Sequence, residues 1–154
     1  MENFFQNVED QLKRAGIATS STTRGCTVKE IETLEKRSGV KLPESYKGFL
    51  ARFGKQAGQL FTGEDCFYDQ LRNLRADAEF LLKENNEPFA LPQDIFVFSM
   101  HQGYEFLFFS TNAGENPPVA QYVEGQGPPQ IVWSKFTDFL IDAINQHVKF
   151  FSDR

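Results

Sequence analysis

The sequence lacks a basic excess, and it lacks any long apolar run. Sixteen Lys and Arg residues stand against 21 Asp and Glu residues, which gives a formal charge of −5. Because a nucleic-acid binder needs a basic patch to contact phosphates, we expect no nucleic-acid partner. No charged leader followed by an apolar stretch is present, so the sequence predicts a protein of the reducing cytoplasm without membrane contact.

Residues that bind metal ions are few and far apart. The cysteines are Cys26 and Cys66, and the histidines are His101 and His147. Zinc ligands come in close pairs that one turn presents together, and these four residues form no such pair. We therefore predict no metal site. Free thiols are favoured over a disulfide, which would need the two Cα atoms within about 7 Å and an oxidising compartment.

Glycine-rich phosphate loops are also missing. Gly54, Gly58 and Gly63 fit neither the Walker nor the dinucleotide-binding spacing, and no strand-loop-helix unit frames them. The sequence thus predicts no cofactor.

Phenylalanine, in contrast, is abundant. The 154 residues include 17 Phe, four Tyr and one Trp. Each buried aromatic ring removes on the order of 150 to 250 Å² from water. A chain of this length buries roughly two-thirds of its unfolded surface. We predict a single domain over residues 1–154 with an aromatic core.

The stretch from Thr27 to Gly39 has the signals of a complete helix. Thr27 and Glu30 have the spacing of a capping box, in which each residue binds the other's backbone N–H through its side chain. Gly39 can end the helix in the left-handed conformation. The expected apolar stripe comprises Val28, Ile31 and Leu34.

A second helix follows at once. Pro43 suits a first helical turn, because the N–H that proline lacks would be unpaired there. Gly54 is placed to end the helix as a second glycine stop. Its expected apolar stripe comprises Tyr46, Phe49, Leu50 and Phe53.

The order of these signals resembles the SUKH superfamily, which includes fungal cell-wall assembly regulators and bacterial toxin-immunity proteins. The residues that carry the resemblance are Leu34-Glu35, Gly39, Leu42-Pro43, Tyr46 and Phe49-Leu50. The resemblance covers about residues 27–144. It implies an α+β fold with a central, largely antiparallel β-sheet flanked by helices, and a protein partner.

The rest of the chain predicts the same α+β class, because helices come first, then strands, then a helix. Aromatic and β-branched runs predict a hairpin of buried strands around the turn His101-Gln102-Gly103. Further strands are expected at 59–62, 119–124 and 131–133. Further helices are expected from a cap at Asn3 to Gly16, over 67–84, and from a cap at Ser134 to about Ile144, with Phe150 and Phe151 extending its contacts.

Met100 to Tyr104 is the most unusual polar segment, because it places an imidazole, an amide and a phenol between very apolar strands. Three interpretations of His101 remain open: a turn histidine bonded to backbone, a partner contact, or a catalytic base. Catalysis is the least favoured, since no serine or cysteine motif surrounds the histidine.

The sequence and the resemblance together predict a non-enzymatic binding protein. The resemblance implies a bacterial immunity protein that neutralises a nuclease or deaminase toxin by binding it. The alternative is a regulatory or scaffold module that docks an endogenous protein. Loop and strand-edge positions are the expected contacts, and an acidic face would steer a basic partner. The candidate partner-binding residues are His101, Gln102, Tyr104, Glu115 and Glu124.

Overall fold

The computed structural model describes the backbone of residues 1–152 and the side chains of residues 1–150. Its helices are α1 (Glu2–Arg14), α2 (Val28–Ser38), α3 (Glu44–Phe53), α4 (Tyr68–Glu84) and α5 (Phe136–Ser152). Its strands are β1 (Thr23–Arg24), β2 (Gln56–Ala57), β3 (Glu64–Asp65), β4 (Ile95–His101), β5 (Glu105–Ser110), β6 (Val119–Val123) and β7 (Gln130–Trp133). The predicted α+β class is confirmed. The contact predicted for the Phe151 side chain lies outside the described residues.

The main sheet is a meander in which every strand pairs antiparallel with the next one along the chain. Its order is β3-β4-β5-β6-β7, and β1 and β2 form a separate small sheet. The predicted hairpin joins β4 to β5, with His101 as the last residue of β4. Gln102 and Gly103 turn the chain with positive φ angles of 49° and 77°. Glycine adopts such an angle without steric cost, which suits Gly103 to this turn.

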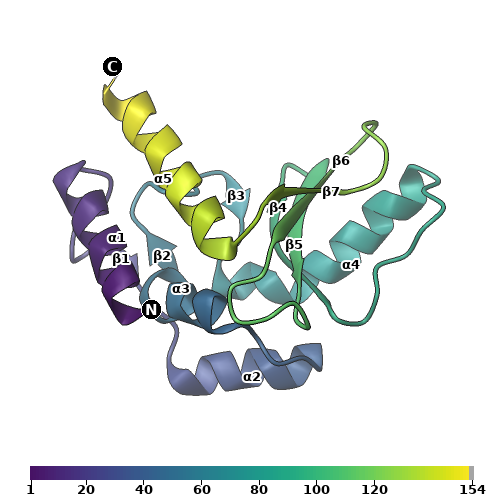
Figure 1. Cartoon of the computed structure of the whole chain (residues 1–154), viewed down its shortest axis with the longest axis horizontal. Coiled ribbons are helices and arrows are strands. Elements are labelled where there is room, and N and C mark those ends of the chain that lie inside the picture. Colours follow the sequence, from purple (N-terminus) through teal and green to yellow (C-terminus); the bar gives the residue numbers. More distant parts are fainter. Residues whose placement is uncertain (153–154) are drawn as a thin grey trace.

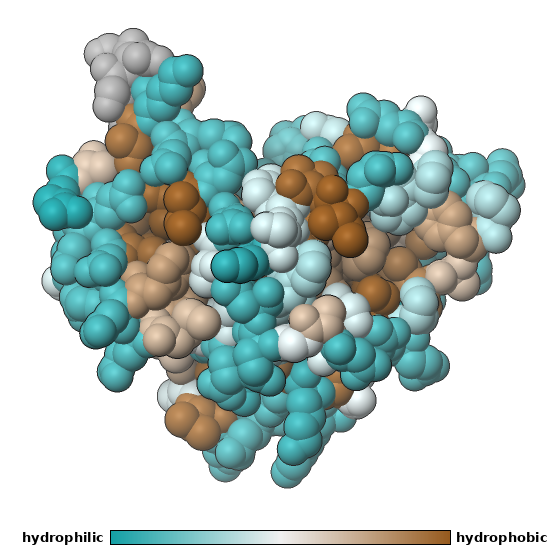
Figure 2. Space-filling view, in the orientation of Figure 1, coloured by the Kyte–Doolittle hydropathy of each residue, from teal (hydrophilic) through white to brown (hydrophobic). Residues whose placement is uncertain are grey.

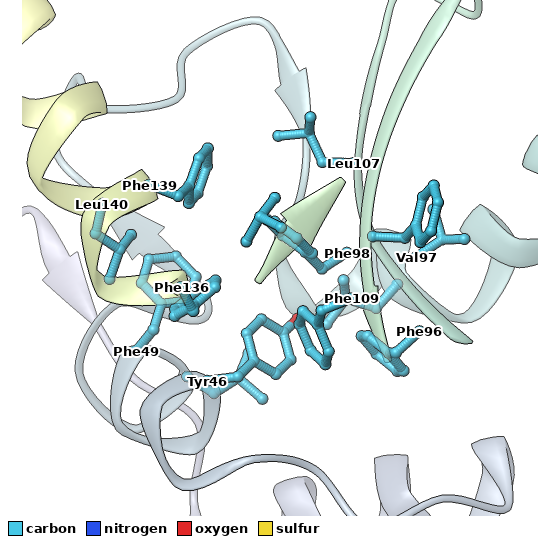
Figure 3. Close-up of a cluster of buried hydrophobic side chains, with 14 of the residues drawn as sticks. Tyr46, Phe49, Phe96, Val97, Phe98, Leu107, Phe109, Phe136, Phe139 and Leu140 are labelled. Atoms are coloured by element: carbon cyan, nitrogen blue, oxygen red, sulfur yellow. The ribbon is translucent and has the colours of Figure 1, made fainter. Parts of the chain in front are cut away.

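The sheet lies between two layers of helices (Figure 1). α4 packs along β4 on one face, whereas α3 and α5 cover the other. On the second face, Tyr46 of α3 and Phe136 of α5 meet Phe98 and Phe109 of the sheet, at ring-centroid distances of 5.2 to 6.1 Å (Figure 3). This cluster is the aromatic core that the composition predicts.

A smaller aromatic group fills the α4 face of the sheet. Phe106 of β5 stacks on Tyr122 of β6 with the ring centroids 5.2 Å apart, and Phe89 covers Tyr122 from the segment after α4. The Tyr122 hydroxyl donates a hydrogen bond of 2.7 Å to the Glu87 carboxylate. The buried phenol therefore has the polar partner that burial demands.

The helical corner, residues 27–54, has the predicted structure. Thr27 Oγ1 accepts the Glu30 N–H at 3.1 Å, and Glu30 Oε1 accepts the Thr27 N–H at 2.9 Å. Gly39 ends α2 with a left-handed φ of +71°. Val28, however, is 74% exposed, so the buried stripe of α2 begins at Ile31. The capping box fixes where a helix begins, and it does not select which residues are buried.

Gly54 follows the last residue of α3, but it is a glycine for a different reason from the one predicted. Its φ of −61° is right-handed, so no glycine stop of the Gly39 type forms there. A Cβ at Gly54 would lie 2.6 Å from Cys26 Sγ and 2.6 Å from the Leu50 carbonyl oxygen. The glycine is therefore required by close approach, because any other side chain would collide with the corner.

Three predicted details are wrong. α1 begins at Glu2, ahead of the proposed Asn3 cap. Residues 59–62 form turns, and the short strands lie on either side of them at β2 and β3. The first turn of α5 is capped from the loop before β6, since Asn116 Oδ1 accepts the Thr137 N–H at 3.1 Å. No local sequence pattern indicates a cap that comes from so far along the chain. Ser134, the predicted cap, instead donates a hydrogen bond to the Asp138 carboxylate.

Candidate partner-binding groove

Four of the five predicted contact residues gather at one end of the sheet. His101, Gln102 and Tyr104 form the β4–β5 turn, and the Glu124 N–H donates to the Tyr104 carbonyl oxygen at 2.9 Å. The rings of His101 and Tyr104 meet edge to face, 5.4 Å apart. The structure thus places these four residues together as one end surface.

Glu115 lies at the opposite end of the sheet, in the loop between β5 and β6. Its carboxylate accepts the Glu44 N–H at 2.7 Å, and its carbonyl oxygen accepts the Ser45 N–H at 3.0 Å. Both donors belong to the first turn of α3, where a negative charge complements the helix dipole. Glu115 therefore fastens this loop to the helical corner.

His101 pairs with a carboxylate from the neighbouring strand. Its Nδ1 lies 2.6 Å from Glu64 Oε1, and both side chains are partly buried. Burial opposes the charged carboxylate and raises the pKa of Glu64, and the attraction to His101 offsets part of that rise. The pair joins β3 to β4, so His101 has a structural partner in a side chain rather than in the backbone.

A groove runs between α5 and the half of the sheet nearest this turn. It has a volume of about 770 Å³, and Figure 2 shows the surface hollowed between α5 and the sheet. We call it the α5 groove. The apolar and aromatic side chains that line it include Phe61, Leu107, Val132, Trp133, Phe139 and Phe150.

Three contacts hold the two walls of the groove in place. Trp133 of β7 packs edge to face on Phe139 of α5, with ring centroids 5.0 Å apart, and its Nε1–H donates to Asp142 at 3.1 Å. Phe61, from the turn before β3, stacks parallel on Phe139 at 5.8 Å. These contacts fix α5 against the strand edge and against the turn, so the groove is a preformed feature of the fold.

The charged groups of the groove are of one sign. Its described lining contains the carboxylates of Glu64, Glu105 and Asp142, and it contains no Lys or Arg. Gln121 donates to Glu105 at 2.7 Å, which orients that carboxylate on the groove floor. His147 also lines the groove, and burial lowers the pKa of its imidazole, which favours the neutral form at pH 7. The groove is therefore both apolar and acidic.

Sequence reasoning did not find this groove. Its lining comes from α5, from the five strands of the main sheet and from the turn over 59–62, so no continuous motif encodes it. One signal was available: the run Ile131-Val132-Trp133 is apolar on both sides of a strand. In the structure Ile131 is 70% exposed and Val132 is 49% exposed. Val132 lines the groove, and its exposure beside the other apolar lining residues is the signal that this run offered.

A second cavity, of about 530 Å³, lies on the α4 face of the sheet. Arg75 of α4 reaches across it and donates to the carbonyl oxygens of Leu91 and Ile95 at 2.8 and 2.9 Å. The same guanidinium also pairs with Glu79 at 2.8 Å. These bonds tie the segment before β4 to α4, so the arginine serves the fold.

The two cysteines are free and buried. Burial raises the pKa of the Cys26 thiol to about 11 and raises that of Cys66 further. Both thiols are protonated at pH 7, and a protonated thiol is a poor nucleophile. Among the described residues, no group of three or more His, Cys, Asp or Glu side chains is placed to hold a metal ion. Over the same residues, every helix is too short or too polar to cross a membrane.

A family model described as SUKH_6, SMI1-KNR4 cell-wall, matches residues 28–140. The match begins with α2, includes the whole sheet and ends within α5. The chain belongs to the SUKH superfamily. The resemblance carried by the helical corner is thereby confirmed. No curated protein matches the chain.

Membership of the SUKH superfamily gives the function at a coarse level. Members act as protein-interaction modules of the immunity or regulatory kind, and they are generally non-catalytic. The matched region contains β7 and the first part of α5, and hence Trp133 and Phe139 of the groove.

Proposed function

We propose that this SUKH domain neutralises a toxin, of the nuclease or deaminase type, by holding part of it in the α5 groove and covering its active site. The observation that carries the proposal is a groove with aromatic walls and three carboxylates, whose described lining contains no Lys or Arg. The role is binding alone, without catalysis.

The apolar walls supply the anchor positions that a stable interface needs. Binding energy concentrates in a few apolar and aromatic contacts that exclude water, and polar groups surround them. Trp133 and Phe139 are fixed against one another, so a partner side chain that packs on them has little conformational entropy to remove. Affinity then depends on slow dissociation.

The carboxylates favour a partner whose contacting surface is positively charged. A toxin that acts on nucleic acid carries a basic surface for phosphates. Glu64, Glu105 and Asp142 attract such a surface and accelerate its association. The predicted contacts His101, Gln102, Tyr104 and Glu124 stand at the turn beside this acidic end, and we keep them in the proposal as the rim. Glu115 remains a separate predicted contact on the far loop.

The test is co-expression with the protein encoded beside this one, followed by co-purification and a survival assay. We expect wild-type protein to keep the cells alive and to co-purify with the toxin. Asp142→Lys places a cation in the groove and should weaken binding by roughly tenfold or more. Asp77→Lys, an exposed position on α4, changes the charge equally and should bind as wild type.

Two results would contradict the proposal. Death of cells that contain abundant, folded wild-type protein contradicts the immunity role for that toxin. Equal binding by Asp142→Lys and wild type removes the groove from the interface. If the partner is not toxic and binds through the same groove, the regulatory alternative, which the cell-wall description of the family favours, replaces immunity.

A further inference from the structure

The two edges of the main sheet differ in chemistry. β3 forms one edge with only Glu64 and Asp65, and both residues are acidic. β7 forms the other edge with Gln130 to Trp133, which carry no charge. Short length and charged side chains are the usual protection of an edge strand against pairing. The β3 edge has both kinds of protection, whereas the β7 edge is short, has a bulge at Val132 and carries no charge.

The β7 edge is also accessible. In the described part of the chain no strand pairs with its outer side, and Ile131 and Val132 are exposed. Pro129 lacks an N–H, so the stretch able to pair begins at Gln130. An edge of this kind offers backbone donors and acceptors to an extended segment.

The two faces beside β7 specify the side chains of such a segment. Ile131 pairs with Ala120, which faces α4, whereas Val132 lines the α5 groove. Along Gln130 to Val132, alternate residues of an added strand would therefore lie beside exposed Ile131 on one face and over Asp142 and the groove carboxylates on the other. The bulge at Val132 ends this alternation, because Trp133 also lines the α5 groove. Apolar residues suit the first face, and basic residues suit the second.

We propose that the partner adds a strand to β7, through an extended segment in which apolar and basic residues alternate. This inference rests on the proposed function, because the segment belongs to the protein held in the α5 groove. A second copy of this chain is disfavoured as the occupant. Pairing β7 with its copy would bring two acidic grooves together, in chains that each carry a formal charge of −5.

The test uses synthetic peptides of about ten residues and NMR of the whole protein. A peptide of alternating valine and lysine should bind with a Kd below about 1 mM. It should slow the exchange of at least one outward-facing amide hydrogen within Gln130–Trp133 by roughly tenfold. The matched peptide of alternating valine and glutamate should not bind.

A protein variant checks the same edge. Ile131→Lys places a charge on the edge strand outside the α5 groove, in the manner of naturally protected edges, and should weaken binding of the lysine peptide by roughly fivefold or more. Val28→Lys alters another exposed β-branched residue, on α2, and should bind the peptide as wild type does.

Four results would overturn strand addition. These are no binding of the lysine peptide at about 1 mM, equal binding of both peptides, binding without slower exchange in β7, and a wild-type dimer by light scattering that Ile131→Lys dissociates. The cognate toxin separates this failure from that of the proposed function. Toxin bound normally by Ile131→Lys but poorly by Asp142→Lys would reject strand addition and leave the groove and its role intact.

Discussion

The helical corner, residues 27–54, and the α5 groove are built in opposite ways. In the corner the capping groups are neighbours in sequence, and the chief apolar side chains are buried. In the groove the side chains come from distant parts of the chain, Val132 and Phe150 are exposed, and the described lining carries three carboxylates and no Lys or Arg. The corner therefore serves stability, whereas the groove leaves apolar side chains exposed that a partner, as proposed, would bury.

Phe136→Ala should destabilise both regions and should cause the largest loss of stability among these variants. Phe136 is fully buried and contacts Tyr46 of the corner and Phe139 of the groove. Removing a buried phenylalanine ring costs about 3 to 5 kcal/mol. Denaturant unfolding followed by circular dichroism measures the loss. A cost below about 1 kcal/mol would show that this cluster is not the centre of the core.

Gly54→Ala should damage the corner and spare the groove. The added Cβ collides with Cys26 Sγ and with the Leu50 carbonyl oxygen, and overpacking of this kind costs about 1 to 3 kcal/mol. Binding of the lysine peptide, measured where the variant is folded, should match wild type. Denaturant unfolding measures the loss, and stability equal to wild type would show that the collision at Gly54 does not occur.

Thr27→Ala should have a smaller effect on the corner alone. It removes the hydroxyl that accepts the Glu30 N–H, and loss of an N-cap costs about 1 kcal/mol. Thr27→Ser keeps the acceptor and should restore most of the stability, which thermal unfolding measures. Equal losses in the two variants would assign the effect to the threonine methyl group rather than to the cap.

The helical corner could be predicted from the sequence, whereas the groove could not. The Thr27–Glu30 box and the glycine stop at Gly39 depend on residues a few positions apart, so the sequence sufficed to predict them. The Asn116 cap of α5 and the Trp133–Asp142 bond depend on chain segments that meet only after folding. The groove belongs to the second kind. The single-domain organisation over residues 1–154 stays a prediction.

Glu64→Gln should have the smallest effect of these variants, a change in how the unfolding free energy depends on pH. Burial raises the pKa of Glu64 above its ordinary value of 4.5. The folded state therefore holds this proton more firmly than the unfolded state. The resulting stabilisation is complete below pH 4.5 and is lost as pH rises through the folded pKa. Unfolding free energies measured across this range should fall less with pH in the variant. Parallel curves would mean that Glu64 does not titrate differently in the two states.

The order of the strands along the chain also affects how the domain folds during synthesis. Each strand from β3 to β7 pairs with the next one along the chain, so the sheet can assemble in the order in which it is synthesised, without waiting for a distant strand. One wall of the groove, however, is α5, which follows every strand of the sheet along the chain. A nascent chain with its sheet complete still lacks Phe139 and Asp142 against Trp133. Binding through the groove, as proposed, therefore requires that α5 has left the ribosome and docked.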